Sequence, residues 1–249
     1  MTRTVAIIQA RMGSTRLPGK VLLPLLDEPL LAHVVRRVSR ARSVDATVVA
    51  TTILPADEVI VELGRRQGWI VERGSENDLL DRYLRAARAH GAEVVVRVTS
   101  DCPLIDPTLI DDVVDAFRGG PADYASNTLP PRTYPRGLDV EVISMEALER
   151  AARDDHDPAW REHATPYIYR HPDRFRLLRV AGSEDHGGLR WTVDTPEDLA
   201  FVRRIFAALP DDSFGWRAVL DLLAAHPDWA DINRMVAQKV VPDGGTPPR

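Results

Sequence analysis

Residues 5–20 are VAIIQARMGSTRLPGK. The apolar first half is typical of a buried β-strand, and the second half is a loop with two glycines, a Ser-Thr pair and three positive charges. Glycines let backbone N–H groups approach a ligand closely, and fixed cations can surround several negative charges. A strand that ends in such a loop predicts a polyphosphate-binding site. The residues expected to form it are Arg11, Gly13, Ser14, Arg16 and Lys20.

The spacing of this basic loop (residues 11–20) differs from that of a P-loop. A P-loop has four residues between its first glycine and its Gly-Lys pair, whereas five separate Gly13 from Gly19 here, and Val21 stands where a Ser or Thr would bind Mg²⁺. Pro18 also stiffens the backbone that would have to wrap a phosphate. The basic loop is therefore another kind of phosphate site or, on local sequence alone, a basic surface turn.

Composition limits the possible functions. The 249 residues suffice for a substantial core, and the net charge of −5 provides no overall basic field to attract nucleic acid. We see no apolar run of membrane-span length and no signal peptide, so we expect a cytoplasmic protein without membrane attachment. The single cysteine, Cys102, excludes an internal disulfide and is expected to pack beside Asp101.

Apolar strand patterns alternate with helical patterns along the first 100 residues. This alternation predicts an α/β fold with a Rossmann-like, mostly parallel sheet and helices on both faces. Strands are expected at residues 4–10, 47–51, 69–72 and 93–99, and helices at 30–40, 57–67 and 77–90. Helix starts are indicated by Ser75 with Asp78, by Asp106 before Pro107 and by Thr195 before Pro196.

Residues 121–186 have a different texture. We interpret them as a small strand-rich insertion in a single domain of residues 1–240, followed by a flexible tail at 241–249. Its expected strands are residues 122–126, 138–143 and 174–180, with a helix near 159–169. The α/β pattern returns with a strand at 189–193 and helices at 196–209 and 216–235, the last interrupted at Pro227.

Two aspartates follow apolar strand patterns. Asp101 comes after the strand at 93–99, and Asp194 comes after the pattern at 189–193. Ligands of open α/β sheets bind at the carboxyl ends of the strands, where a carboxylate that faces a phosphate loop is a natural Mg²⁺ ligand. The competing roles are local, because Asp101 can cap the turn before Pro103 and Asp194 can simply precede a helix.

Five blocks of the chain resemble the signature motifs of the cytidylyltransferase family, which includes the CMP-sugar synthetases for sialic acid and 3-deoxy-manno-octulosonate. The blocks are QARMGSTRLPGK (9–20), RGSE (73–76), DCPLID (101–106), YPRGLDVE (134–141) and WTVDTPED (191–198). They are most similar to the spore-coat polysaccharide branch of the family. The resemblance extends to about residue 233.

The resemblance implies an enzyme that transfers CMP from CTP to a hydroxyl of an acidic sugar or related acceptor and releases pyrophosphate, for surface polysaccharide or glycoconjugate biosynthesis. It matches Asp101 to the aspartate that carries the catalytic metal, and it favours Asp194 as the second ligand of Mg²⁺, or of Mn²⁺ in its place. Arg11, Arg16 and Lys20 would then stabilise the leaving pyrophosphate. A homodimer is also implied, whereas no general base is identified.

The resemblance also suggests which residues contact the nucleotide. The nucleobase pocket is expected around the end of the first strand and the RGSE block, and the residues before Asp101 are expected to approach the ribose or a metal-bound phosphate. Ser75 has a competing role as a helix cap. The nucleotide-binding candidates beyond the basic loop are Gln9, Ala10, Arg73, Ser75, Thr99 and Ser100.

The acceptor is expected to bind in the insertion. An arginine or His163 would hold the sugar carboxylate, although for His163 a partly buried structural role is the alternative. Asp139 and Glu141 share one face of a predicted strand. The acceptor-binding candidates are Asn127, Arg136, Asp139, Glu141, Arg161 and His163.

Two other functions remain open on the sequence. A metal-dependent glycosyltransferase also uses an aspartate at a strand end, but it would bind a preformed nucleotide sugar, and the basic loop argues against it. A non-catalytic nucleotide-binding protein would leave Asp101 and Asp194 beside three cations without an explanation.

Overall fold

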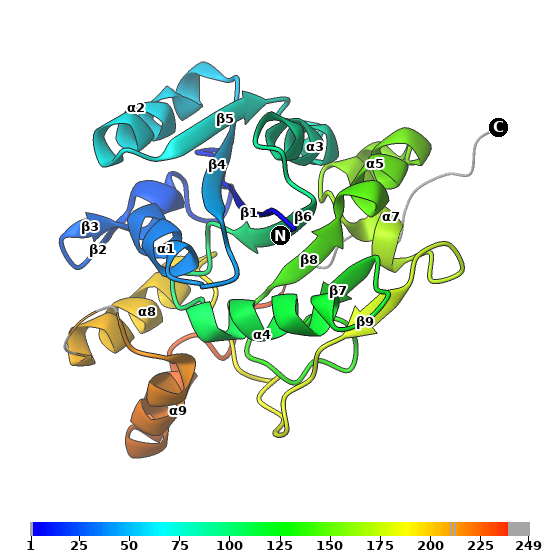
Figure 1. The fold of residues 1–249 in the computed structure, drawn as a ribbon. Coiled ribbons are helices and arrows are strands. Elements are labelled where there is room, and N and C mark those ends of the chain that lie inside the picture. Colours follow the sequence, from blue (N-terminus) through cyan, green and yellow to red (C-terminus); the bar gives the residue numbers. More distant parts are fainter. Residues whose placement is uncertain (1, 210, 212, 239–249) are drawn as a thin grey trace.

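The computed structural model describes residues 2–209, 211 and 213–238, and the tail predicted at 241–249 lies outside them. Its centre is a seven-stranded sheet in the order β5-β4-β1-β6-β8-β7-β9, with helices on both faces (Figure 1). The strands are β1 (Thr4–Gln9), β4 (Ala46–Thr52), β5 (Ile70–Gly74), β6 (Val94–Thr99), β7 (Tyr124–Ser126), β8 (Glu141–Ser144) and β9 (Leu177–Arg179). A separate two-stranded sheet pairs β2 (Pro24–Leu25) with β3 (Glu28–Pro29).

The helices follow the strands along the chain. The longer ones are α1 (Leu30–Ser39), α2 (Glu58–Gln67), α3 (Leu79–Ala89), α4 (Pro107–Arg118), α5 (Met145–Asp154), α8 (Pro196–Ala208) and α9 (Trp216–Ala225). Short helices are α6 (Pro158–Arg161) and α7 (Pro166–Tyr169), with 3-10 turns at Lys20–Leu22, Pro55–Asp57 and Pro227–Asp231. Within the described part of the chain, no helix has the length and apolar character needed to cross a bilayer.

Side-chain alternation along the strands builds a core on each face of the sheet. Ala6 and Ile8 of β1 belong to the cluster that packs against α1, α4 and α8, whereas Val5 and Ile7 point to the opposite cluster, formed with α3 and α5. Strands that are buried on both faces explain the continuous apolar runs in the sequence. The predicted α/β fold class is confirmed: β5, β4, β1 and β6 are parallel, and β8 is antiparallel to both neighbours.

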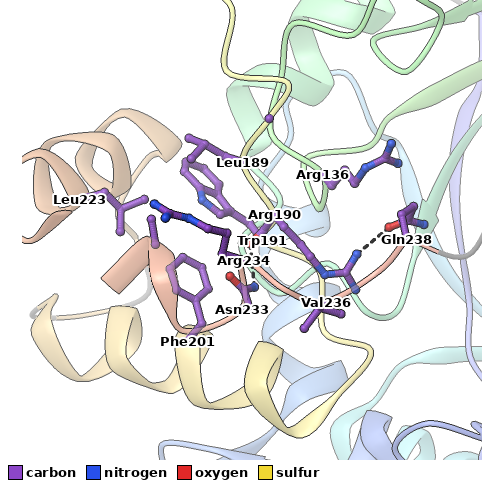
Figure 2. A pocket seen from close by; sticks show the side chains of 12 residues that line it. Arg136, Leu189, Arg190, Trp191, Phe201, Leu223, Asn233, Arg234, Val236 and Gln238 are labelled. Carbon is purple, nitrogen blue, oxygen red and sulfur yellow. Dashed lines mark hydrogen bonds between the residues drawn. The ribbon is translucent and has the colours of Figure 1, made fainter. Parts of the chain in front are cut away.

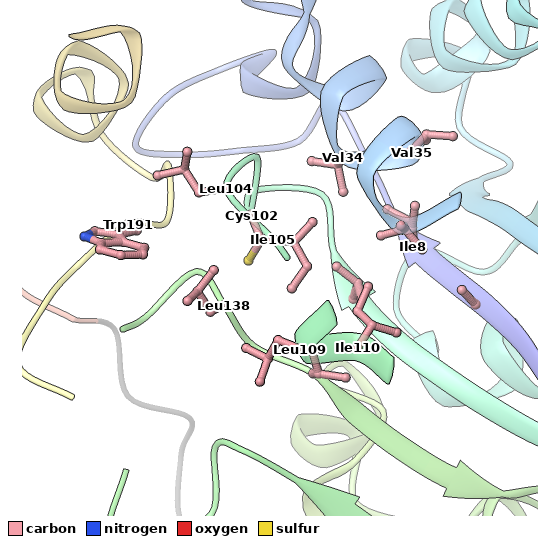
Figure 3. Packing of buried hydrophobic residues seen from close by; sticks show 14 of the residues in the cluster. Ile8, Val34, Val35, Cys102, Leu104, Ile105, Leu109, Ile110, Leu138 and Trp191 are labelled. Carbon is pink, nitrogen blue, oxygen red and sulfur yellow. The ribbon is translucent and has the colours of Figure 1, made fainter. Parts of the chain in front are cut away.

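Cys102 is buried in the first of these clusters, beside Leu104, Ile105 and Leu138 (Figure 3). Burial is the main cause that raises the pKa of its thiol well above the ordinary value. The predicted packing role of Cys102 is therefore confirmed.

The strand-rich segment departs from the expected arrangement in several places. Strands β7, β8 and β9 of this segment continue the main sheet beyond β6. Helix α5 was not predicted, although its N-cap Ser144 accepts a hydrogen bond from the backbone of Ala147. The single helix predicted at 159–169 is two short helices, because the backbone at Ala164 has a φ of +67°.

The strand predicted at 189–193 is wrong. This segment makes one isolated bridge, between Arg136 and Arg190, and its apolar side chains Trp191 and Val193 are buried in the first cluster. The Val193 N–H donates to the carbonyl oxygen of Asp101 at 2.8 Å. That bond places Asp194 beside Asp101 without a strand.

Candidate active site

A cavity of about 390 Å³, the loop cavity, lies at the carboxyl ends of β1 and β6. Two loops far apart in the sequence meet there, because the parallel strands that precede them are neighbours in the sheet. Its lining residues are Gln9, Ala10, Arg11, Gly13, Ser14, Thr15, Arg16, Lys20, Glu76, Leu79, Arg82, Thr99, Ser100, Asp101, Glu162, His163 and Asp194.

Lys20 bridges the two aspartates that the sequence singled out. Its Nζ donates to Asp101 Oδ2 and to Asp194 Oδ1, each at 2.8 Å, and to the carbonyl oxygen of Val193 at 2.9 Å. The Thr99 hydroxyl donates to the other Asp101 oxygen at 2.5 Å. Both carboxylates therefore converge on one point that a single cation occupies.

This cluster shifts the pKa values of its members. Burial acts to raise the pKa of Asp101, but the Lys20 ammonium and the Thr99 hydroxyl outweigh it and lower that pKa to about 2. Burial acts to lower the pKa of Lys20, and the two carboxylates reverse the effect and raise it above its ordinary value. Both groups are therefore charged at neutral pH.

The other cations of the basic loop also face carboxylates. Arg16 lies 3.0 Å from Asp194 and donates to the carbonyl oxygen of Ala237 at 3.4 Å. Arg11 lies 3.5 Å from Glu76 and 3.7 Å from Glu162. The positive charge that the sequence predicted for a polyphosphate is thus balanced by acidic side chains in this structure.

A buried carboxylate holds the basic loop in place. Asp57, which is 1% exposed, accepts the backbone N–H of Met12 at 2.6 Å and a hydrogen bond from the Thr52 hydroxyl. Asp57 lies in the loop that follows β4, and Arg73 holds this loop in place. Its Nε donates to the Thr52 carbonyl oxygen at 3.0 Å, and its Nη1 lies 2.7 Å from Glu58. Asp57 was not among the predicted residues.

Arg82 is a second residue that sequence reasoning missed. It lies three residues after Leu79 and four before Ala86, on the buried face of α3. This face of an amphipathic helix is normally apolar, so a charged residue there is unusual. It is 4% exposed, and its Nη1 donates to the Ser75 carbonyl oxygen at 2.9 Å. Its Nε has no hydrogen-bond partner among the described residues, and its side chain lines the loop cavity.

Comparison with known proteins identifies the family. Residues 5–214 match the family model described as cytidylyltransferase. The chain belongs to the cytidylyltransferase family. It is therefore a CTP-dependent nucleotidyltransferase, which decides against the glycosyltransferase and non-catalytic alternatives.

Related proteins cover nearly the full length of this cytidylyltransferase. It is 34% identical over 244 residues to the spore coat polysaccharide biosynthesis protein SpsF of Bacillus subtilis, covering 92% of this chain and 98% of that protein. It is 40% identical over 243 residues to the 3-deoxy-manno-octulosonate cytidylyltransferase of Anaeromyxobacter sp. strain K, covering 84% and 99%. A solved cytidylyltransferase structure from Leptospira borgpetersenii is 32% identical, with a TM-score of 0.90, and 96% and 100% of the chains are covered.

Several predicted site residues of this cytidylyltransferase lie outside the loop cavity. Among the nucleotide candidates, Arg73 braces the loop after β4, and Ser75 accepts the N–H of Asp78, which is itself the N-cap of α3. The other predicted nucleotide residues line the cavity. The Gln9 side-chain oxygen is held there by the Tyr83 hydroxyl at 3.0 Å and by Arg97 Nε at 3.1 Å.

Most acceptor candidates have structural partners instead. Asn127 bonds the backbone of Leu138 and Val140, Asp139 pairs with Arg132, Glu141 pairs with Arg97 and Tyr124, and Arg161 pairs with Asp78. These polar groups hold the strand-rich segment together and tie it to β6 and to the start of α3. Of the acceptor candidates, His163 lines the loop cavity, and Arg136 lines a second cavity.

The donor set at Lys20 fits a divalent cation. Two carboxylates that both reach one ammonium nitrogen at 2.8 Å are close enough to hold one ion, and Mg²⁺ in nucleotide enzymes is bound by one or two carboxylates together with phosphates. Among the described residues, no group of three or more His, Cys, Asp or Glu side chains is placed to bind a metal without such help.

Proposed function

We propose that this cytidylyltransferase transfers CMP from CTP to a hydroxyl group of an acidic sugar. The observation that carries the proposal is the pair Asp101 and Asp194, held together by Lys20 under a cavity rimmed by Arg11 and Arg16. The names of the two relatives, one from spore-coat polysaccharide biosynthesis and one a 3-deoxy-manno-octulosonate cytidylyltransferase, support the acceptor class and a role in surface polysaccharide synthesis.

The triphosphate binds by exchange of partners. The side chains of Arg11, Arg16 and Lys20 break their ion pairs with the carboxylates and bind phosphate oxygens instead. Hydrogen bonds between these cations and phosphate are shorter and stronger than hydrogen bonds between neutral groups. The unpartnered Nε of Arg82, whose side chain also lines the loop cavity, offers an N–H to the nucleotide. Burial is the main cause that lowers the pKa of Arg82. A nucleotide atom that accepts a hydrogen bond from its Nε would therefore stabilise a buried cation that lacks one hydrogen bond.

Asp101 and Asp194, once released by Lys20, would hold Mg²⁺ or Mn²⁺. The ion would supply charge neutralisation at the α-phosphate and lower the pKa of a bound hydroxyl. Thr99 keeps Asp101 oriented through its 2.5 Å hydrogen bond. Asp198, which caps α8 and accepts from Arg190, fixes the backbone that carries Asp194.

In the reaction, the acceptor oxygen forms a bond to the α-phosphorus while the bond to the bridging oxygen of the β-phosphate breaks. Pyrophosphate leaves with that electron pair, and the hydroxyl proton passes to solvent. Arg11, Arg16 and Lys20 stabilise the charge that develops on the leaving group. Catalysis is thus by positioning and charge neutralisation.

A nucleotide panel tests the proposal. Thermal unfolding with Mg²⁺ should show a large stabilisation by CTP, about 2.7 kcal/mol at 100 times its dissociation constant, and weak effects of ATP and GTP. Pyrophosphate release from CTP should then require a sugar acid. Equal stabilisation by all nucleotides would contradict the CTP site, and release only with neutral acceptors would contradict the acceptor class.

A further inference from the structure

Among the described residues, three cationic side chains form ion pairs with Asp194. Lys20 Nζ lies 2.8 Å from Asp194 Oδ1, and a guanidinium nitrogen of Arg16 and one of Arg190 each lie 3.0 Å from its Oδ2. Under the proposed function, Lys20 and Arg16 break these ion pairs when they bind the triphosphate. Arg190 is then the cation of the three that stays beside Asp194.

Arg190 is anchored by a fully buried carboxylate. Its Nε and Nη2 donate to the two oxygens of Asp198, each at 2.8 Å, and Nη2 also donates to Asp194 Oδ2 at 3.0 Å. The side chain of Asp198 is 0% exposed and that of Arg190 is 9% exposed, whereas that of Arg16 is 35% exposed. Breaking this two-pronged pair would leave a buried charge without its partner, so Arg190 is held far more firmly than Arg16.

Helix capping alone does not account for this arrangement. Asp198 completes the capping box of α8 by accepting the N–H of Thr195 at 3.1 Å, and it also accepts the N–H of Asp194 at 3.0 Å. A capping box requires no arginine. The bond from Arg190 Nη2 to Asp194 Oδ2 joins the cap to a side chain that lines the loop cavity. Both the backbone and the side chain of Asp194 are therefore fixed by this buried ion pair.

The C-terminal segment (residues 232–238) holds Arg190 from another side (Figure 2). Asn233 is 3% exposed, and its Nδ2 donates to the Arg190 carbonyl oxygen at 3.0 Å and to Asp198 Oδ1 at 2.9 Å. The side-chain oxygen of Gln238 accepts a hydrogen bond from Arg190 Nη1 at 2.6 Å. A segment that follows α9 in the chain is thus connected to Asp194 through one arginine.

This network leaves one oxygen of Asp194 available to a metal ion. Because Nη2 of Arg190 holds Oδ2, rotation of the carboxylate is restricted. Its Oδ1 faces the point where Lys20 Nζ lies 2.8 Å from both Asp194 and Asp101. Outer partners of this kind orient metal ligands and strongly affect metal affinity.

We propose that Arg190 is a positioning residue that presents Oδ1 of Asp194 to the catalytic divalent ion, and that Asn233 of the C-terminal segment keeps Arg190 in place. This inference rests on the proposed function and adds to it residues that lie outside the loop cavity. Arg190 touches neither the nucleotide nor the metal and acts through Asp194.

R190K and N233A test the proposal, because neither substitution changes the charge beside Asp194. Lysine lacks the fork that binds Asp198 at two points and Asp194 at a third, and N233A removes two hydrogen bonds but retains the buried ion pair. Mn²⁺ binding is measured by electron paramagnetic resonance, without nucleotide, in a K20Q background, where no ammonium lies between the two carboxylates. We expect the Mn²⁺ affinity of K20Q to fall about 10- to 100-fold on adding R190K and about 3- to 10-fold on adding N233A.

The kinetics of the single variants provide a second measurement. With CTP, Mn²⁺ and a sugar acid, kcat should fall more in R190K than in N233A, and the half-saturating Mn²⁺ concentration should rise in both. The KM of CTP should stay nearly unchanged, because the cations of the basic loop still bind its phosphates.

S126A is the matched control for N233A. Ser126 is fully buried, donates to the Val140 carbonyl oxygen at 2.9 Å, accepts the Thr128 N–H at 2.9 Å and lines neither cavity. S126A should lower the free energy of unfolding, which thermal unfolding measures, and leave the Mn²⁺ affinity of K20Q unchanged.

The outcomes separate this inference from the proposed function. Unchanged Mn²⁺ affinity in both double variants would contradict the positioning role, and so would an equal loss in K20Q/S126A. Absence of Mn²⁺ binding to K20Q itself would contradict the proposed metal site and this inference together. Pyrophosphate release with neutral acceptors only would contradict the proposed acceptor, while weaker Mn²⁺ binding in the double variants would still support the role of Arg190.

Discussion

The two cavities of this cytidylyltransferase differ in how their positive charge is neutralised. In the loop cavity, Arg16 and Lys20 lie 3.0 Å or less from carboxylates, and Arg11 lies 3.5 Å from one. In the second cavity (Figure 2), Arg190 pairs with Asp198 and Arg234 pairs with Asp231, neither of which lines the cavity, whereas Arg136 has no ion pair or side-chain hydrogen bond with the described residues. The cations of the loop cavity must break ion pairs before they bind an anion, whereas Arg136 in the second cavity can bind one directly.

This difference suggests how the metal site is assembled. Under the proposed function, a triphosphate that binds Lys20 would free Asp101 and Asp194 as its phosphate oxygens become available to complete the coordination of a divalent ion. The balanced charges also keep three cations and two partly buried carboxylates compatible with a stable fold before nucleotide binds. We therefore expect the metal affinity of the loop cavity to depend on bound nucleotide.

The largest effect is expected from D101N, which breaks the loop cavity at its centre. The substitution keeps the shape and removes the charge, so kcat should fall about 10²- to 10³-fold while CTP still binds through the cations. D194N should behave alike, and the double variant should be little worse, because the two carboxylates act as a unit. Pyrophosphate release measures this, and multiplicative losses in the double variant would contradict a shared ion.

The next effect is expected from K20Q, which removes the cation that exchanges. Its affinity for CTP should fall about 10- to 100-fold and its affinity for CMP much less, because CMP lacks the β- and γ-phosphates. Without nucleotide, K20Q should bind Mn²⁺ more tightly than the wild type, because Lys20 no longer competes for Asp101 and Asp194. Calorimetric titrations measure both affinities. An equal loss of affinity for CTP and CMP would contradict the proposed contact of Lys20 with the β- and γ-phosphates.

A smaller effect is expected from D57A, which loosens the basic loop without touching its cations. Loss of the bond to the Met12 N–H should lower the free energy of unfolding by about 1–2 kcal/mol and also weaken CTP binding. D45A is the matched control, since Asp45 accepts the Thr4 N–H at 2.7 Å away from the loop. Urea unfolding and CTP titration compare them, and an equal loss of CTP affinity in D45A would show that the effect is not local.

The last effect, no larger than that of D57A, concerns pH. The pKa of Asp101 is lowered to about 2, so its contribution to stability is complete above the unfolded value near 4 and is lost as pH falls from about 4 toward 2. Lys20 has a raised pKa, so its contribution is present below about 10.5 and is lost as pH rises beyond it. Urea unfolding at pH 7, 4 and 2.5 should show that the free energy of unfolding falls more on acidification in the wild type than in D101N, by up to about 2 kcal/mol. An equal fall in both proteins would contradict the lowered pKa of Asp101.

Local signals allowed much of the fold to be predicted. β1 and the basic loop are neighbours in sequence, so apolar runs and loop chemistry identify them together. The structure of segment 189–193 was harder to predict, because Trp191 and Val193 pack in the core without belonging to a strand. The position of Arg136 depends on the contact of Gly137 with the Trp191 backbone, which no local pattern reveals.

The candidate site shows the same division. Asp101 and Asp194 were identified because a residue's place after an apolar segment is visible in the sequence, and the fold brings the two together. Asn127 and Glu141 were proposed for the acceptor, yet they hydrogen-bond within the strand-rich segment, since buried polar networks and ligand sites use the same residue types. Arg82 shows that an arginine on an apolar helix face is a signal that sequence reasoning can use.

The central claim is the exchange of partners in the loop cavity, and a crystal structure with CTP and Mg²⁺ tests it most directly. We predict that Lys20 Nζ lies against the triphosphate, away from at least one of its two carboxylates, and that the metal lies near 2.1 Å from an oxygen of Asp101 or Asp194. A structure in which Lys20 still bridges both carboxylates at 2.8 Å with CTP bound, or in which only phosphates and other side chains hold the metal, would contradict it.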